Sequence, residues 1–296
     1  MNTAVIETPT ELRNVPAPAK LNVFLHIVGR RPDGYHLLQS VFMLIDWCDT
    51  LHFKLRADGA IHRIDALPGT TLPEHDLVVR AAQALQTATG CTLGADITLE
   101  KRLPSEAGMG GGSSDAASTL LALNRLWDLR LSRQQLANIG LTLGADVPFF
   151  VGGRNAWVEG IGEQLTPVAL PPGRFVVVKP PTGASTAAIF GSPILKRDTK
   201  PAILSGFAAD AQAHPELVWS HGANDLQAVA QAVCPDISDS IAWLTHKGLK
   251  ARMTGSGSAV FAPWVEGTDL SDAPPGWQIK ICSNWAEHPL RAWCEG

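Results

Sequence analysis

A glycine-rich stretch between a predicted strand and a predicted helix constrains the fold of this chain more than any other feature. Residues 97–103 have the pattern of a strand that ends at Pro104, and all but one of residues 108–112 are glycine. An amphipathic pattern then begins near Ser113. Glycine leaves backbone N–H groups accessible, and a helix N-terminus carries partial positive charge. The order strand, glycine loop and helix favours a phosphate site over a flexible loop in which Ser113 or Ser114 merely caps the helix.

The glycine loop differs from the common nucleotide-binding motifs. No G-x-x-x-x-G-K-[ST] sequence occurs, and in a dinucleotide fingerprint that starts at Gly108 the third glycine position falls on Ser113. The H-R-D and D-F-G signatures of protein kinases are absent. The sequence therefore argues against a Walker-type NTPase, a dinucleotide-dependent enzyme and a protein kinase.

Two isolated charges are candidates for chemistry beside phosphate. Lys20 precedes the alternating apolar segment 21–28 and is expected at the mouth of a strand, where it neutralises a phosphate or remains a plain surface lysine. Asp146 is the one charge between Gln135 and Gly153. A carboxylate in apolar surroundings must be paired, hydrogen-bonded or protonated, so Asp146 is a candidate general base. The alternative is an aspartate that caps a short helix.

Two further segments each have two interpretations, and for residues 254–257 taken alone a hairpin turn is favoured. Residues 254–257, Thr-Gly-Ser-Gly, lie between two predicted strands and either pack against the glycine loop or form a simple hairpin turn. Tyr35, the single tyrosine of the chain, and His36 follow a Pro-Asp-Gly turn between two apolar segments that we expect to form a hairpin. An aromatic ring and an imidazole there suit stacking on a base and hydrogen bonding to it, or packing at the start of a strand.

Composition limits the class of protein. The 296 residues carry a net charge of -4, which argues against nucleic acid as a partner, and 45% are hydrophobic, as in a globular protein. The five cysteines are widely spaced without a C-x-x-C pair, which suits a reducing compartment. No signal peptide and no membrane-spanning stretch is apparent, and residues 1–15 have an irregular, polar pattern. We therefore expect a cytoplasmic protein without a membrane partner.

Strand and helix patterns alternate in both halves of the chain, which predicts an α+β fold. Residues 167–173 hold three prolines and a glycine and form the candidate boundary. The predicted domains are therefore residues 1–166 and 167–296. The sequence leaves a monomer and a homodimer equally open.

The order and the amino-acid sequences of the motifs resemble those of the GHMP kinases. The evidence is PAKLN and GRRPDGYH near the start, GMGGGSSDAA and LGADVPFF in the middle, and TGSGSAVF towards the end, over roughly residues 16–265. The resemblance implies a ribosomal-protein-S5-like N-terminal domain that binds ATP and a ferredoxin-like C-terminal domain. It also implies ATP and Mg²⁺ as cofactors.

Within the family, GRRPDGYH distinguishes kinases for a small-molecule substrate with a cytidine diphosphate moiety from mevalonate, homoserine and galactose kinases. The implied reaction transfers the γ-phosphoryl of ATP to the 2-hydroxyl of a methylerythritol unit in the non-mevalonate isoprenoid pathway. The alternatives are a GHMP kinase for another alcohol and a catalytically idle nucleotide-binding protein, against which the presence of both Lys20 and Asp146 argues.

The resemblance also implies residue roles. Asp146 would be the base and Lys20 its electrostatic partner. The residues that would surround the ATP phosphates are Pro104, Ser105, Glu106, Ala107, Gly108, Met109, Gly110, Gly111, Gly112, Ser113 and Ser114. The substrate would contact Asn22, Tyr35, His36 and Phe190. A supporting loop would consist of Thr254, Gly255, Ser256 and Gly257. The magnesium ligands stay unidentified. Glu106 departs from the family, which usually has a small residue there, and its carboxylate would repel phosphate unless it points to solvent or the metal.

Overall fold

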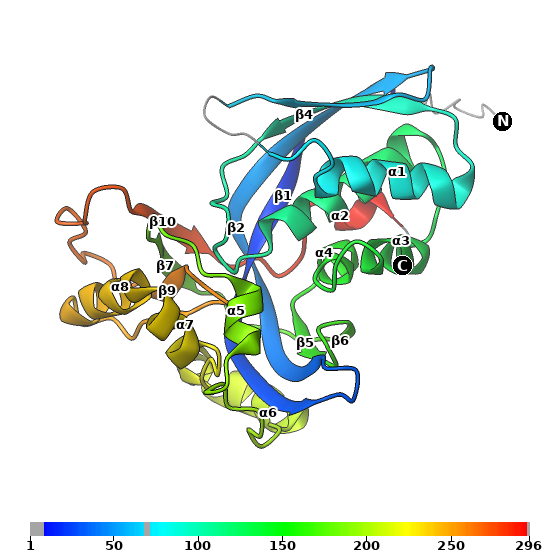
Figure 1. Cartoon of the computed structure of the whole chain (residues 1–296). Coiled ribbons are helices and arrows are strands. Elements are labelled where there is room, and N and C mark those ends of the chain that lie inside the picture. The colour runs from blue at the N-terminus through cyan, green and yellow to red at the C-terminus, as the bar shows by residue number, and fades with distance from the viewer. Residues whose placement is uncertain (1–8, 68–71, 295–296) are drawn as a thin grey trace.

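A computed structural model describes residues 9–67 and 72–294 of the chain and contains two sheets flanked by helices (Figure 1). The six-stranded sheet has the order β3-β4-β2-β5-β6, with β1 paired to β2, and every pairing is antiparallel except that of β3 with β4. Its strands are β1 (Glu11–Arg30), β2 (His36–Arg56), β3 (Ile61–Asp65), β4 (Gly94–Glu100), β5 (Ala156–Glu159) and β6 (Gln164–Pro167).

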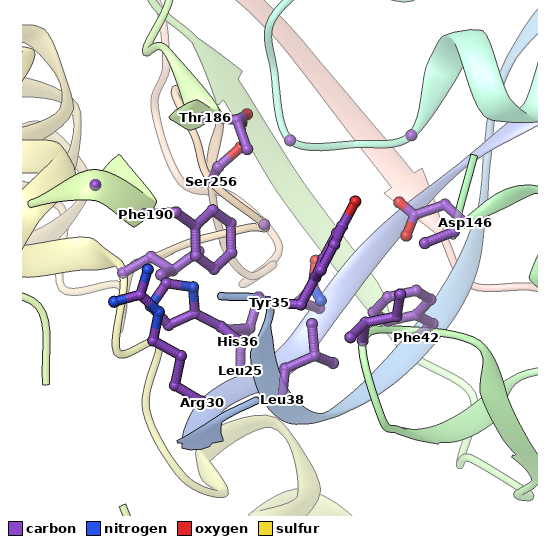
Figure 2. Close-up of a pocket in the computed structure, with 18 of the residues that line it drawn as sticks. Leu25, Arg30, Tyr35, His36, Leu38, Phe42, Asp146, Thr186, Phe190 and Ser256 are labelled. Atoms are coloured by element: carbon purple, nitrogen blue, oxygen red, sulfur yellow. Dashed lines mark hydrogen bonds between the residues drawn. The ribbon is translucent and has the colours of Figure 1, made fainter. Parts of the chain in front are cut away.

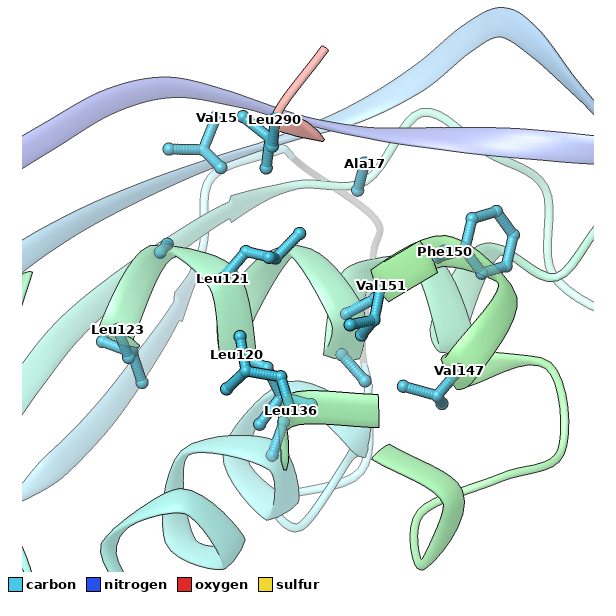
Figure 3. Close-up of a cluster of buried hydrophobic side chains, with 14 of the residues drawn as sticks. Val15, Ala17, Leu120, Leu121, Leu123, Leu136, Val147, Phe150, Val151 and Leu290 are labelled. Carbon is cyan, nitrogen blue, oxygen red and sulfur yellow. The ribbon is translucent and has the colours of Figure 1, made fainter. Parts of the chain in front are cut away.

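Four helices cover one face of the first sheet: α1 (Leu77–Thr89), α2 (Gly111–Leu126), α3 (Arg133–Leu141) and α4 (Val147–Gly152). Helix α1 starts after Asp76, whose side chain accepts from the Val79 N–H, and ends at Gly90 in the left-handed conformation. Helix α2 is buried along nearly its whole length: Leu121 points towards Val15 of β1, whereas Leu120 lies beside Leu136 of α3 (Figure 3). This packing fixes the start of α2, and with it the glycine loop, against the centre of the sheet.

The second sheet is antiparallel with the order β10-β7-β9-β8. Its strands are β7 (Arg174–Lys179), β8 (Arg252–Met253), β9 (Val260–Pro263) and β10 (Gln278–Ser283), and the helices of this half are α5 (Thr186–Gly191), α6 (Leu204–Ala213), α7 (Gln227–Val233) and α8 (Pro235–His246), with 3-10 turns at Pro215–Ser220 and Arg291–Trp293. Mixed strands and helices in both halves confirm the predicted α+β class.

The predicted hairpin of β1 and β2 is confirmed, but its strands are much longer than the sequence indicates and reach both halves (Figure 1). Val15 belongs to the core beneath α2, whereas Leu25 and Ile27 pack with Val176 of β7. The expectation that residues 1–15 are irregular is wrong for 11–15, which pair with β2, and residues 1–8 lie outside the described part. Apolar alternation does not mark the start of β1, because residues 11–14 are mostly exposed and Pro16 and Pro18 follow them.

The end of the chain returns to the first sheet. The Trp285 N–H donates to the Leu44 carbonyl at 2.9 Å, and Leu290 lies in the core beneath α2. Arg133 of α3 donates to the carbonyls of Arg291 and Cys294, both at 2.6 Å. The domain boundary between residues 166 and 167 stays a prediction. The segment after β10, although it follows this boundary in the sequence, packs against the first sheet.

Two expectations concern features that the structure can test directly. Cys48, Cys91, Cys234 and Cys282 are free thiols in the described part of the chain. Among residues 9–67 and 72–294, no helix has both the length and the apolar character needed to cross a bilayer.

Candidate active site

Two cavities meet at the glycine loop. The first, of about 820 Å³, is lined by Lys20, Asn22, Tyr35, His36, Asp146 and Phe190 among others, and the second, of about 620 Å³, is lined by residues 104–113. Gly108 and Gly110 line both cavities, as do Thr186 and Ser256. The residues that the sequence analysis singled out therefore gather around two adjoining chambers that share one glycine wall.

The glycine loop and the 254–257 turn are in backbone contact. Gly108 has φ +69°, and a Cβ there would lie 2.3 Å from the Thr254 carbonyl oxygen, so only glycine fits. The Ser258 N–H donates to the Glu106 carbonyl at 3.0 Å. The turn connects the paired strands β8 and β9, so it is a hairpin connection that also packs on the glycine loop. Both interpretations of this segment hold at once.

Helix α2 begins without a side-chain cap. Its N-cap is Gly110, with φ +70°, and no side chain bonds the first turn, so the interpretation that Ser113 or Ser114 caps the helix is wrong. Ser113 lines the second cavity, whereas Ser114 is fully buried and lines neither cavity. The uncapped N–H groups and the helix dipole at this end favour an anion in the second cavity.

The Glu106 carboxylate lies against the second half of the molecule, at Gly183. A Cβ at Gly183 would come within 1.9 Å of Glu106 Oε2, so the side chain lies directly against this glycine. Burial lowers the pKa of Lys179 behind it, and the Glu106 charge opposes that shift. The residue is exposed at the rim of the second cavity, so solvent and Lys179 screen its charge from a phosphate.

Lys20 lies in the middle of β1, and the expectation that it sits at the mouth of a strand is wrong. The register of β1 against β2 shifts between Pro18 and Lys20, and the Lys20 N–H donates to the Met109 carbonyl at 3.0 Å. Its Nζ donates to Asn22 Oδ1 at 2.6 Å and to the Gly108 carbonyl at 2.9 Å. Burial lowers the pKa of Lys20 and the charge of Asp146 opposes that shift.

Asp146 faces Lys20 across the first cavity. Its Oδ2 lies 3.9 Å from Lys20 Nζ, and 31% of its side chain is exposed. Asp146 occupies the N-cap position of α4, but its side chain makes no capping hydrogen bond, so the helix does not engage the carboxylate. A partly exposed carboxylate beside a buried lysine can accept a proton from a bound hydroxyl group.

Aromatic side chains from both halves line the other end of the first cavity (Figure 2). Tyr35 is 60% exposed, so it does not pack in the core, and it stands between Phe190 and Asp146 in Figure 2. The rings of His36 and Phe190 have centroids 5.1 Å apart. Asn22 is buried and links Lys20 to Ser40, whose Oγ accepts from Nδ2 at 2.9 Å.

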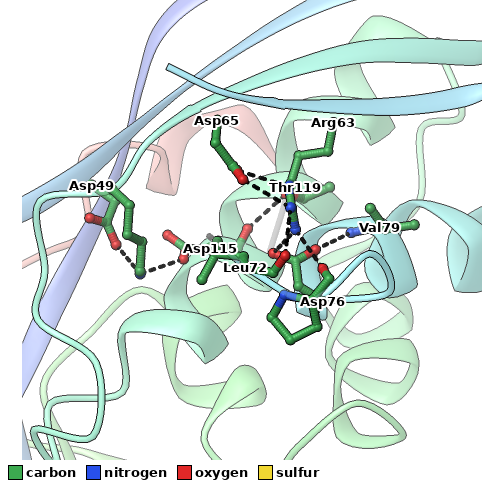
Figure 4. Close-up of polar contacts among 10 residues, drawn as sticks. Asp49, Arg63, Asp65, Leu72, Asp76, Val79, Asp115 and Thr119 are labelled. Carbon is green, nitrogen blue, oxygen red and sulfur yellow. Dashed lines mark hydrogen bonds and ion pairs between the residues drawn. The ribbon is translucent and has the colours of Figure 1, made fainter. Parts of the chain in front are cut away.

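A buried ionic cluster behind the glycine loop was not predicted. Lys101 Nζ donates to Asp115 Oδ2 at 2.7 Å and also to Asp49 (Figure 4). Asp49 Oδ1 also accepts the Leu103 N–H at 2.7 Å, which fixes the entry to the loop. Burial raises the pKa of Asp115 well above its usual value, and Lys101 lowers it only in part. Lys101 and Asp115 flank the loop in the sequence, but nothing there indicates their partner Asp49.

Comparison of the sequence with known proteins identifies the family of this chain. The family models described as GHMP kinases N terminal domain and GHMP kinases C terminal match residues 76–154 and 207–266. A 4-diphosphocytidyl-2-C-methyl-D-erythritol kinase of Paracidovorax citrulli is 62% identical over 95% of this chain and 97% of its own length, and the enzyme of that name from Polaromonas naphthalenivorans is 61% identical over 95% and 96%. The chain belongs to the GHMP kinase family.

Solved structures support the fold of this GHMP kinase. A crystal structure of 4-(cytidine 5'-diphospho)-2C-methyl-D-erythritol kinase matches with a TM-score of 0.74 at 33% identity, over 93% of this chain and 98% of that one. The homoserine kinase of Cytophaga hutchinsonii, at 15% identity and a TM-score of 0.69 over 97% and 98%, shares the fold. The predicted GHMP architecture is therefore confirmed. The protein is a phosphotransferase, and GHMP kinases use ATP as the phosphate donor.

Proposed function

We propose that this GHMP kinase phosphorylates the 2-hydroxyl of 4-diphosphocytidyl-2-C-methyl-D-erythritol with ATP, in the non-mevalonate route to isoprenoid precursors. The observation that carries the proposal is the junction of the two cavities at Gly108 and Gly110, with Lys20 and Asp146 beside it. One cavity then holds the donor and the other the acceptor. The names of the relatives at about 60% identity support the choice of substrate.

ATP phosphates occupy the second cavity in this proposal. The first turn of α2 contributes N–H groups and the positive end of its dipole, and Ser113 contributes a hydroxyl. The whole of the predicted segment 104–114 surrounds this position, although Ser114 supports it from the interior. The buried cluster of Lys101, Asp49 and Asp115 holds the loop in place, because phosphoryl transfer depends on positioning more than on covalent chemistry.

The acceptor occupies the first cavity. Its cytosine stacks on Tyr35 and Phe190 and bonds to His36, which are the roles that the family resemblance implies. Asn22 orients Lys20 and reaches the same cavity. Gly255, Ser256 and Gly257 close the wall between the cavities from the side of the second sheet. Thr254 supports this loop from the interior, where its Oγ1 accepts from the Asn22 N–H at 2.9 Å.

The chemical step uses two side chains. Asp146 accepts the proton of the acceptor hydroxyl as the oxygen attacks the γ-phosphorus. Lys20 lies between Asp146 and the glycine loop, so its positive charge stabilises the negative charge that develops on the transferred group. Asp146 orients the hydroxyl and takes up its proton as the transition state forms.

We include Mg²⁺ as a cofactor because the family resemblance implies it. Among the described residues no cluster of three or more His, Cys, Asp or Glu side chains could hold a metal ion. Buried Asp115 Oδ1 has no hydrogen-bond partner in the described part of the chain, and the Ser113 hydroxyl lines the same cavity. These hard oxygen donors fit a Mg²⁺ ion held largely by ATP phosphates, where it would neutralise their charge.

ADP release tests the proposed function. The full chain is supplied with ATP, Mg²⁺ and 4-diphosphocytidyl-2-C-methyl-D-erythritol, with mevalonate and homoserine as control acceptors. We expect ADP release only with the cytidyl substrate. Release with a control acceptor would overturn the substrate assignment and keep the kinase, and ATP binding without release on any acceptor would favour an idle nucleotide-binding protein.

A further inference from the structure

Arg197 lies against the ring of His36 and was not singled out by any sequence motif. Its Nε donates to His36 Nε2 at 3.0 Å. The other guanidinium nitrogens donate to the carbonyls of Leu195 at 3.0 Å, Ser192 at 2.7 Å and Phe190 at 3.4 Å. The guanidinium is therefore fixed by backbone groups at the end of α5, with one donor directed at the imidazole.

This contact determines which ring nitrogen of His36 carries the proton. An arginine side chain has only donors, so His36 Nε2 must accept with its lone pair. The neutral ring then has its proton on Nδ1. No hydrogen bond to Nδ1 is present within residues 9–67 and 72–294, and His36 lines the first cavity. The ring can therefore offer an N–H donor to a ligand.

The charges around His36 also favour its uncharged form. Burial lowers the pKa of His36, and the charges of Arg197, from the segment after α5, and Arg30, from β1, lower it further. Phe190 covers the ring from α5 without a charge. The hydrogen bond from Arg197 and the surrounding charges therefore both favour the uncharged imidazole, whose single proton lies on Nδ1.

We propose that Arg197 is a positioning residue that keeps His36 uncharged with its proton on Nδ1, so that His36 donates a hydrogen bond to the pyrimidine ring of the acceptor. The inference rests on the proposed function for the identity of the ligand. Cytosine has an acceptor at N3, whereas uracil has a donor there, so a fixed donor on His36 favours cytosine. Arg197 also ties Phe190 to the same imidazole, which joins the two sides of the base site.

The tautomer can be measured without any substrate. ¹⁵N-labelled histidine in the full chain gives the protonation state of each ring nitrogen by NMR, and a His36→Gln variant identifies the His36 signals. We expect protonated Nδ1 and unprotonated Nε2 at neutral pH. A proton on Nε2 would overturn the inference, and this result does not depend on whether the proposed function is correct.

Kinetics of Arg197→Met test the consequence for substrate. Without Arg197 the ring can place its proton on Nε2, so we expect KM for the cytidyl substrate to rise about five- to tenfold at neutral pH, with KM for ATP unchanged. Acidification protonates both nitrogens and restores the Nδ1 donor, so KM should fall again at low pH. Preference over the uridine analogue should decrease in the same variant.

Two comparisons separate positioning from simple damage to the site. Tyr35→Ala removes a stacking ring but leaves the tautomer, so its raised KM should not recover on acidification. Arg197→Lys keeps the charge but loses the fixed Nε donor, and we expect an intermediate KM. A native KM for Arg197→Met, or a raised KM that is equal at low and neutral pH, would overturn the inference.

Discussion

The molecule buries two lysines beside the glycine loop, and they have different surroundings. Only 4% of the Lys20 side chain and 9% of the Lys101 side chain is exposed. Lys101 Nζ contacts two carboxylates directly, those of Asp49 and Asp115. Lys20 Nζ bonds to an amide and a backbone carbonyl, and its one carboxylate partner, Asp146, lies 3.9 Å away.

The two environments shift the lysine pKa in opposite directions. Burial lowers the pKa of Lys101, but Asp115 and Asp49 raise it further than burial lowers it. Burial lowers the pKa of Lys20, and Asp146 opposes only part of that shift. A lysine whose charge is balanced by two contacting carboxylates has a structural role. A lysine whose charge is only partly balanced can still stabilise negative charge on a substrate. The comparison therefore separates a structural lysine from a functional one.

Lys101→Met should have the largest effect on stability. It leaves Asp49 and Asp115 buried without their cation, and we expect the free energy of unfolding to fall by about 3–5 kcal/mol in chemical denaturation. Adding Asp115→Asn should recover part of the loss, because it removes one of the two uncompensated carboxylates. A loss below about 1 kcal/mol would show that the cluster is not the framework we describe.

Lys20→Met should separate activity from stability. We expect kcat to fall at least about 100-fold, because a charge that stabilises the transition state is lost. The free energy of unfolding should change by less than about 2 kcal/mol, because the variant also removes a costly buried charge. Steady-state kinetics and denaturation of the same preparation measure both. Near-native kcat would contradict the assignment of Lys20 as the functional lysine.

The pH dependence of stability should differ in sign between the two lysines. For Lys20 the folded pKa is lowered, so the unfolded chain takes up the proton first as pH falls below 10.5, and the native enzyme should lose stability relative to Lys20→Met. For Lys101 the folded pKa is raised, so its contribution should stay constant up to pH 10.5 and be lost only above it. Denaturation of the native enzyme and both variants across the alkaline range measures this. Parallel curves would contradict the comparison.

The sequence predicts the local parts of the site well, because their signals are local. Glycines at 108 and 110 adopt the positive φ that their residue type indicates, and Asp76 and Gly90, which bound α1, are residue types that favour helix ends. Asp146 is recognisable because its whole neighbourhood is uncharged. In each case a residue's type and its immediate neighbours contain the information.

The remaining features depend on contacts between distant segments. Asp49 lies 52 residues before Lys101, and Arg197 lies 161 residues after His36. The start of β1 has no local signal, because residues 11–14 are mostly exposed and are held in the sheet by pairing with β2. The return of Leu290 to the first core has no periodic signal at all. Only the folded chain brings these groups together.

Single-turnover transfer by Asp146→Asn tests the central claim most directly. The substitution keeps the size of the side chain and removes its negative charge. The account predicts that ATP and 4-diphosphocytidyl-2-C-methyl-D-erythritol both bind within a few fold of the native enzyme, whereas phosphoryl transfer falls at least about 100-fold. Transfer at a near-native rate would contradict the assignment of Asp146 and the chemistry at the junction of the two cavities.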